Sequence, residues 1–144
     1  MPDDKIIKRG EKLVALFNTA PIKHTFGMTF RYDSEGSAIF ELPYNPRFDH
    51  ALRGIHGGAI ATLIDNAGWF TVAARHDTWI ATVEFQTRLL EPVEKEKLIS
   101  RGWLIRAGKS LSTAGMEVKT EGGRLIAVGS GTFAVTSVPF GHNA

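Results

Sequence analysis

The sequence predicts one α+β domain in which a single antiparallel sheet wraps around a long central helix. The chain has 144 residues, of which 43% are hydrophobic and 22% charged, and this suits one globular domain with its own core. Residues 57–75 have helical spacing and are apolar nearly all round. Most of the other apolar segments alternate with polar residues, as strands do. These observations together favour a sheet around a buried helix.

The N-terminal segment is expected to form a helix of its own. Residues 5–18 are charged but carry an apolar stripe at helical spacing, and Pro21 is expected to mark the end of that region. Residues 43–55 hold two prolines and are expected to form a loop. The expected organisation is a single domain over 1–144, with a helix in 1–20, a core in 21–138 and a tail at 139–144.

Strands are expected at 25–33, 36–42, 79–90, 95–107, 110–121 and 124–137. Ser34-Glu35-Gly36 is a plausible hairpin turn between the first two. Turns at Ala107-Gly108-Lys109 and Glu121-Gly122-Gly123 separate the last three strands, which predicts an antiparallel meander. In 79–90 the alternation puts Ala81, Val83, Phe85 and Leu89 on one side and Thr82, Glu84, Gln86 and Arg88 on the other.

The central helix has two apolar faces. One groups Ile60, Leu63, Ile64, Ala67, Thr71 and Ala74; the opposite one groups Ala61, Gly68, Trp69 and Val72, with Asp65 among them. One sheet is expected to leave a helix face exposed, so the second apolar face predicts burial against another subunit. We expect a homodimer at least, and a homotetramer as the assembly.

Composition and motifs exclude several classes of function. A net charge of +2, with pI about 9.0, does not call for a nucleic-acid partner. The absence of cysteine excludes disulfides and thiolate metal sites. No signal peptide or membrane-spanning run is found in the sequence, so a cytoplasmic protein without a membrane partner is expected. His50 and His56 lack a third ligand at a usual metal spacing, so no metal or other cofactor is expected.

Asp65 is the strongest candidate for chemistry. Aspartate is a poor residue for a helix interior, and its neighbours on this helix are small or apolar. A carboxylate in such a place is partly desolvated, which raises its pKa. Perturbed carboxylates often mark active sites, although a solvated aspartate beside a water-filled gap would give the same pattern.

His56-Gly57-Gly58 stands where the central helix begins. The first N–H groups of a helix have no partner within it, and glycine lets a ligand approach them closely. Such donors could stabilise the oxyanion formed when a thioester carbonyl is attacked. Alternatively, the glycines only shape the turn into the helix, and His56 is a core histidine.

Basic residues on the strands are candidates for holding the phosphates of a substrate. Arg88, Arg101, Arg106 and Lys109 lie on strands or on the turn between two of them. Each could equally belong to the solvated face of a sheet.

The run from His56 to Ala67, HGGAIATLIDNA, resembles the signature of the phenylacetate-degradation (PaaI-type) branch of the hotdog thioesterases, in the 4-hydroxybenzoyl-CoA thioesterase-like superfamily. The resemblance covers about residues 45–135, including the strand with Thr82 and the Glu91-Pro92 bend. It implies a hotdog fold and hydrolysis of an acyl-CoA, with an aryl or medium-chain acyl group, to the free acid and CoA.

The resemblance also implies roles for particular residues. Asp65 matches the helix carboxylate that acts as general base or nucleophile, and Gly57 matches the backbone N–H that polarises the thioester carbonyl. His56 is implied as a supporting residue, Gly58 as a substrate contact, and Thr82 as a residue that holds the water or the carboxylate. The family builds each site between two subunits. It often has asparagine where this chain has His50, a departure that bears on the step that positions water.

Two alternatives to the thioesterase remain open. The first is a hotdog module that binds acyl-CoA without cleaving it. The second is a hotdog hydratase or dehydratase acting on enoyl or hydroxyacyl thioesters, in which a histidine, His50 or His56, would work with Asp65.

Overall fold

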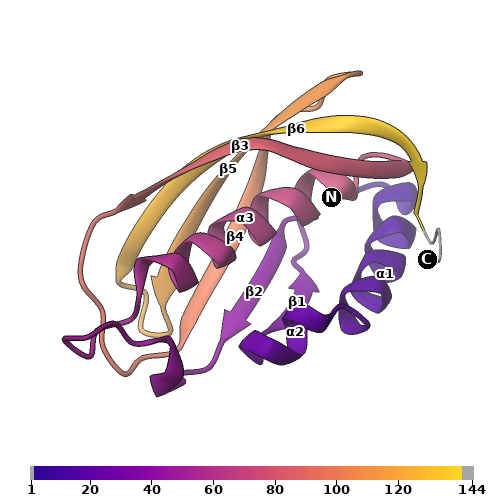
Figure 1. The fold of residues 1–144 in the computed structure, drawn as a ribbon. Helices are drawn as coiled ribbons and strands as arrows, with labels where there is room; N and C mark the ends of the chain where they lie inside the picture. The colour runs from indigo at the N-terminus through magenta and orange to yellow at the C-terminus, as the bar shows by residue number, and fades with distance from the viewer. Residues whose placement is uncertain (1, 141–144) are drawn as a thin grey trace.

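A curved antiparallel sheet wraps around one long helix in the computed structural model, which describes residues 2–140 (Figure 1). The helices are α1 (Asp4–Asn18), α2 (Pro21–Phe26) and α3 (Gly57–Ala73), with a short 3-10 helix, η1 (Pro46–Phe48). The strands are β1 (Thr29–Tyr32), β2 (Ala38–Leu42), β3 (Thr78–Leu89), β4 (Leu98–Arg106), β5 (Leu111–Thr120) and β6 (Leu125–Pro139). This architecture confirms the hotdog fold.

The six strands lie in the order β1-β2-β4-β5-β6-β3. The predicted meander is confirmed for β4, β5 and β6, which pair in sequence. Strand β3 does not lie beside β4, its neighbour in sequence; it pairs with β6 at the far side of the sheet. Strand β3 is therefore a long edge strand, with one row of backbone groups facing away from the sheet.

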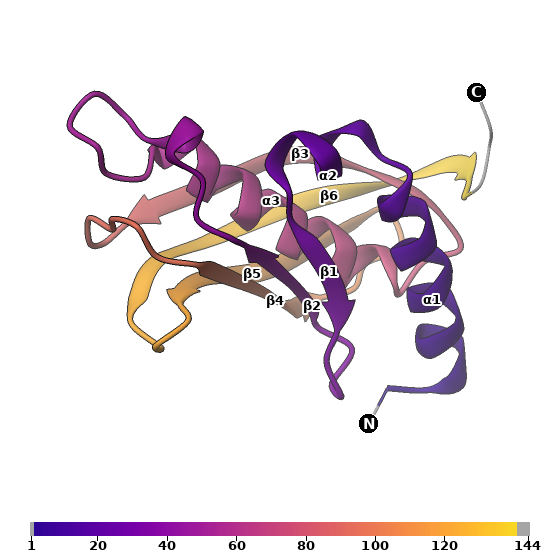
Figure 2. The same cartoon turned by 90° about the horizontal axis from the view of Figure 1, so that it is seen from below.

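The N-terminal region confirms one prediction and corrects another. Helix α1 forms where it was expected and packs Leu13 and Phe17 into the core. The strand predicted from residue 25 begins only at Thr29, because α2 occupies the preceding residues (Figure 2). Pro21 starts that helix, since its fixed φ suits the first helical position, and Gly27 ends it with a left-handed φ of 73°.

Helix α3 lies directly against the sheet. A side chain at Gly102 of β4 would come within 2.2 Å of the Ala67 carbonyl oxygen, so the glycine is what allows this approach. The Thr71 hydroxyl, buried in the same region, accepts a hydrogen bond from the Ala38 N–H of β2. The helix is thus fixed against two strands, and its predicted first face is buried as expected.

The prediction for the second face of α3 is partly wrong. Gly68 and Val72 are already buried within the chain, since the sheet curls far enough to bring Met116 and Phe133 against Gly68. Ala61, Thr62, Asp65, Asn66 and Trp69 stay only partly buried. The part of this face that stays exposed within one chain is therefore a narrower strip than the sequence suggested, and Asp65 lies in it.

Two points concern the ends of the chain and its helices. No helix within residues 2–140 is both long and apolar enough to cross a membrane. Of the predicted tail, residues 141–144 lie outside the described part of the chain.

Candidate active site

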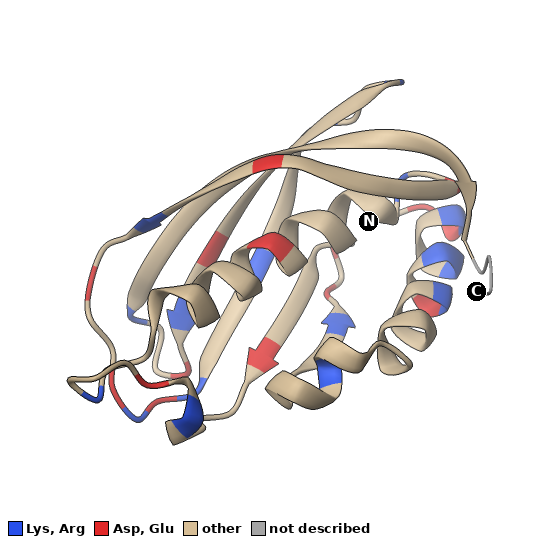
Figure 3. Ribbon diagram, in the orientation of Figure 1, with Lys and Arg blue, Asp and Glu red and all other residues tan. Residues whose placement is uncertain are grey.

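Asp65 lies midway along α3 and is the only charged residue of that helix (Figure 3). Its side chain is half-buried, and its Oδ1 accepts a hydrogen bond of 3.0 Å from the Thr82 hydroxyl. Burial raises the pKa of Asp65 above its usual value, and the Thr82 hydrogen bond partly opposes this because it favours the charged form. The result is a partly desolvated carboxylate, held in place by a neutral donor.

A break in the register of β3 brings Thr82 to Asp65. Thr82 pairs with Phe133 and Glu84 with Thr132, so Val83 is an extra residue that bulges from the strand. Thr82 and Phe85 both face inward as a result, whereas Val83 is 59% exposed. The predicted alternation, which grouped Thr82 with Glu84 and Val83 with Phe85, is therefore wrong across this bulge.

His56 is the N-cap of α3. Its Nδ1 accepts a hydrogen bond of 2.8 Å from the Gly58 N–H, which satisfies one of the helix's free donors. Within residues 2–140 the Gly57 N–H makes no hydrogen bond. Of the two glycines predicted to meet substrate, Gly57 has the available N–H, while the N–H of Gly58 is engaged in the cap.

An apolar cleft of about 250 Å³ opens beside Gly57. Its walls come from the start of α3, the end of β3 and the segment after it. They are mainly apolar, from Ile55, Ile60, Leu89, Leu90, Pro92 and Val93, with one carboxylate, Glu91, among them. His50 also lines the cleft, and its Nδ1 accepts a hydrogen bond from the Leu52 N–H at 3.1 Å. A neutral His50 then carries its proton on Nε2, where it can be donated.

His56 and Gly57 face different hollows. The His56 side chain borders a smaller one of about 200 Å³, beside Phe26, Phe48 and Asp49. Within one chain, His56 caps the helix that presents Gly57. Its predicted role as a supporting site residue stays a prediction.

Asp65 and Gly57 are separated along the helix. Eight residues of α helix span about 12 Å, while the reacting atoms of a single carbonyl lie about 3 Å from both the attacking group and the oxyanion donor. One chain alone therefore does not bring these two groups to the same carbonyl.

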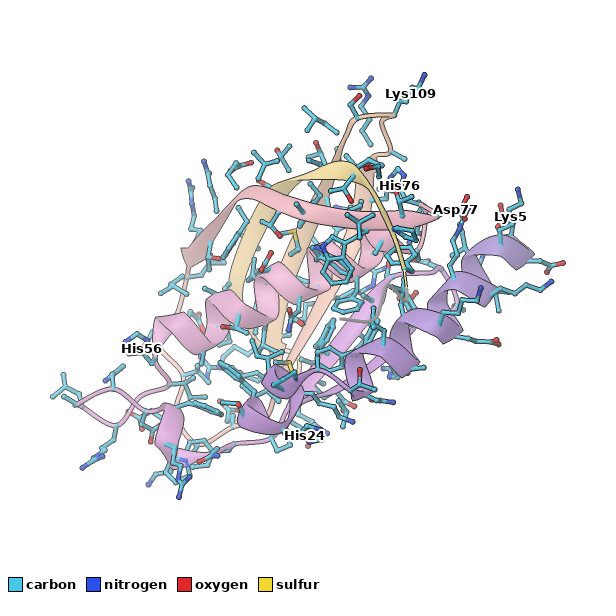
Figure 4. The ribbon with its side chains drawn as sticks, turned by 45° about the vertical axis from the view of Figure 1, so that its right-hand side comes forward. Lys5, His24, His56, His76, Asp77 and Lys109 are labelled. Carbon is cyan, nitrogen blue, oxygen red and sulfur yellow. The ribbon has the colours of Figure 1, made fainter. Side chains whose placement is uncertain are left out.

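The predicted phosphate-binding residues divide between two ends of the molecule. Arg88 is exposed near the end of β3, next to the Leu89 that approaches Gly57. Lys109 lies on the β4–β5 turn, at the opposite end of the molecule from His56 (Figure 4), and Arg106 ends β4 beside that turn. Arg101 is held by Asp33 and Glu35, at 3.0 and 2.6 Å, as part of a structural ion-pair cluster.

Comparison with known protein families identifies the family and the enzyme class of this chain. The family model described as "Thioesterase superfamily" matches residues 54–127, which is half of the chain and includes Gly57, Asp65 and Thr82. The chain belongs to the thioesterase superfamily. Its enzyme class is accordingly thioester hydrolase, as the resemblance at His56–Ala67 implied.

One relative in sequence and two solved structures of similar fold illustrate what this thioesterase resembles. A protein of Saccharolobus solfataricus, named provisionally as an esterase, is 28% identical over 102 residues, covering 70% of this chain and 73% of its own. The Escherichia coli PaaI protein, from the phenylacetic acid degradation operon, superposes with a TM-score of 0.83 at 15% identity, over 94% of this chain and 96% of its own. Thioesterase HI1161 of Haemophilus influenzae gives 0.81 at 20% identity, over 93% and 94%.

Sequence reasoning missed the apolar lining of the thioesterase's cleft. Leu89 and Leu90 are 54% and 44% exposed, which is unusual for two adjacent leucines outside an interface or a binding groove. They follow an alternating strand and precede the Glu91-Pro92 bend. Two consecutive leucines at the end of a strand were the available signal, although nothing local showed that Gly57 would lie beside them.

No three His, Asp or Glu side chains gather as metal ligands anywhere in residues 2–140. The expected lack of a metal or other cofactor stays a prediction.

Proposed function

We propose that this thioesterase hydrolyses an acyl-CoA to the free acid and CoA, with Asp65 as general base or nucleophile and the Gly57 N–H as oxyanion donor. The observation that carries the proposal is the state of Asp65: a half-buried carboxylate with a raised pKa, held by Thr82 on an otherwise uncharged helix. Keeping a charge there costs stability. A raised pKa also makes a carboxylate a better base.

The proposed site is shared between two subunits. Strand β3 offers an unpaired edge, and Trp79, Val83 and Leu89 along it are exposed. Two copies joined antiparallel along this edge by a two-fold axis would bury those side chains. Their α3 helices would then run side by side in opposite directions, so that Gly57 of one chain approaches Asp65 of the other. A homotetramer, as expected from the sequence, would pair two such dimers.

Two chemical routes are compatible with Asp65. As a base, it takes a proton from water while the water oxygen bonds to the carbonyl carbon; the C–S bond then breaks and the sulfur receives that proton. As a nucleophile, its own oxygen displaces the thiolate, and water then cleaves the resulting anhydride. Single-turnover hydrolysis in ¹⁸O-water tests for the second route: water that attacks the Asp65 carbonyl of the anhydride leaves its oxygen in the Asp65 side chain, and the general-base route places no label there.

His50 is assigned a positioning role in this reaction. It lines the same cleft as Gly57, and its Nε2 is the available donor once Nδ1 accepts from Leu52. An imidazole in this tautomer can supply the single N–H that an asparagine amide would supply at the same place. His50→Asn should therefore retain more activity than His50→Ala.

The proposal is tested by following release of free thiol from a panel of aryl- and alkyl-acyl-CoA esters. Release of CoA, with one acyl class clearly preferred, supports it. Tight binding of the esters without release would favour a binding module. Addition of water across an enoyl-CoA, with the thioester left intact, would favour the hydratase. Either result would overturn the proposal.

Thr82→Val is expected to move the acidic limb of the kcat profile toward higher pH. Asp65 acts in its ionised form, so activity rises with pH through its pKa; loss of the hydroxyl removes the hydrogen bond that lowers that pKa. The control is Thr87→Val, since the Thr87 hydroxyl on the same strand is buried but has no hydrogen-bond partner within the described residues. An equal shift in both variants would contradict the role of Thr82.

A further inference from the structure

Three segments of the chain meet around the cleft beside Gly57. The Ile55 N–H donates to the Val93 carbonyl at 2.9 Å, which ties the loop before α3 to the segment after β3. A side chain at Gly57 would approach Leu89 Cδ1 to 2.9 Å, so the end of β3 lies against the start of the helix. The cleft therefore has a continuous rim made of residues distant in sequence.

Cations occur on each of these three segments. Arg53 lies two residues before Ile55, Arg88 lies one before Leu89, and Lys95 lies two after Val93. Each neighbour lines the cleft. Two residues of chain span at most about 7 Å even when extended, and a long basic side chain can cover that distance. Figure 3 shows Lys and Arg segments at the tip of β3 and on the loops beside the start of α3.

These three cations are not used elsewhere in the described structure. All are exposed, and none forms an ion pair within residues 2–140. Of the acidic residues on these segments, Glu91 and Glu96 bind Arg124 at 2.9 and 2.8 Å and Asp49 accepts a hydrogen bond from Tyr44, whereas Glu94 forms no ion pair within residues 2–140. The three cations are therefore free of ion pairs in the described part of the chain and available to an anionic ligand.

The backbone at two of the three positions is unusual. Arg53 and Lys95 have φ values of 70° and 48°, and they are the only non-glycine residues with positive φ in the described part of the chain. This conformation is uncommon for residues with a side chain and costs free energy. Such positions more often carry glycine or asparagine, so a long cation at both is notable.

We infer that Arg53, Arg88 and Lys95, here called the cationic rim, bind the phosphate groups of the CoA carrier. The inference rests on the proposed function and specifies how the substrate enters. The uncharged arm of the carrier would lie in the apolar cleft, which leads to the Gly57 N–H. Its phosphates would stay at the mouth, where guanidinium and ammonium groups bind phosphate oxygens by charge-assisted hydrogen bonds.

The experiment compares three thioesters with the same acyl group: the CoA ester, the 3′-dephospho-CoA ester and the N-acetylcysteamine ester, which has no phosphate. The rim variant is Arg53→Gln/Arg88→Gln/Lys95→Gln. A matched variant, Lys5→Gln/Lys8→Gln/Lys12→Gln, removes the same charge from exposed positions on α1; Lys5 lies far from His56 (Figure 4). Binding of CoA itself is measured by calorimetry for all proteins.

The rim variant should raise KM for the CoA ester, and Kd for CoA, about tenfold, since each exposed pair contributes a fraction of a kcal/mol to about 1 kcal/mol. Its kcat, and its KM for the N-acetylcysteamine ester, should not change. The α1 variant should keep the wild-type KM and Kd. The increase in KM and Kd that the rim variant causes should become smaller as salt is added.

Other outcomes would overturn the inference. An unchanged Kd for CoA in the rim variant would do so, as would an equal loss with the N-acetylcysteamine ester. So would a larger effect from Arg106→Gln/Lys109→Gln, which would place the phosphates at the other end of the subunit. If the wild type cleaves none of the three esters, the proposed hydrolysis fails, while the calorimetry still tests the rim.

Discussion

Asp65→Asn is expected to lower kcat/KM for acyl-CoA about a hundredfold or more, the range typical of losing a general base or nucleophile. Asparagine keeps the size of the side chain and can still accept the Thr82 hydrogen bond, but it can neither take a proton from water nor attack a carbonyl. The measurement is thiol release under saturating and limiting substrate. Glu84→Gln, which removes an exposed carboxylate from the neighbouring strand β3, serves as the control and should retain activity.

The same variant should be at least as stable as wild type. Burial raises the folded-state pKa of Asp65, so the protonated form favours folding and the ionised form opposes it above that pKa. The neutral asparagine side chain removes this cost at neutral pH, and the advantage should disappear as pH falls and Asp65 of the wild type takes up its proton. Thermal unfolding of both proteins across that pH range shows whether the difference in stability has the expected sign. If Asp65→Asn proves less stable than wild type, its loss of activity would reflect loss of the folded state and not loss of the catalytic carboxylate.

Gly57→Pro is expected to lower kcat by a factor of about 10²–10³, the usual effect of losing one oxyanion-hole donor. Proline removes the backbone N–H but suits this place. Gly57 is the first residue of α3, where proline is well tolerated. The preceding His56 already has φ −63° and ψ 137°, the conformation that a following proline requires.

Gly57→Ala is the matched control, because it adds a side chain and keeps the N–H. Its Cβ would lie 2.9 Å from Leu89 Cδ1, the far end of a flexible side chain that can shift. A modest change in KM is expected. Equal loss of kcat in the alanine and proline variants would show that crowding of the cleft, and not the N–H, is responsible.

The fold could be predicted from sequence because its main signals are local. The apolar spacing of residues 57–75 and the turns at Gly108 and Gly122 give the helix and the meander directly. The edge position of β3 depends on a long-range pairing with β6, which no local pattern specifies. Helix α2 was missed because Pro21 indicated an end to the first helical region, although proline also begins helices.

The site was predicted only in part. The position of Asp65 on an uncharged helix followed from spacing, and its partner Thr82 followed from the family resemblance. The bulge at Val83, which turns Thr82 toward Asp65, has no sequence signal such as a glycine. Arg53 and Lys95, which we infer to bind phosphate, had no signal in the sequence because they lie on loops whose meeting depends on the Ile55–Val93 hydrogen bond.

The shared site, built from Asp65 of one subunit and Gly57 of the other, is the central claim, and complementation tests it most directly. Asp65→Asn and Gly57→Pro chains, each nearly inactive alone, are coexpressed with different tags, and the mixed dimer is isolated. A shared site predicts about half of the wild-type activity per dimer, because one site then receives an intact Asp65 and an intact Gly57 while the other receives both defects. If each chain builds its own site, both sites carry one defect; a mixed dimer no more active than its parents would therefore contradict the account.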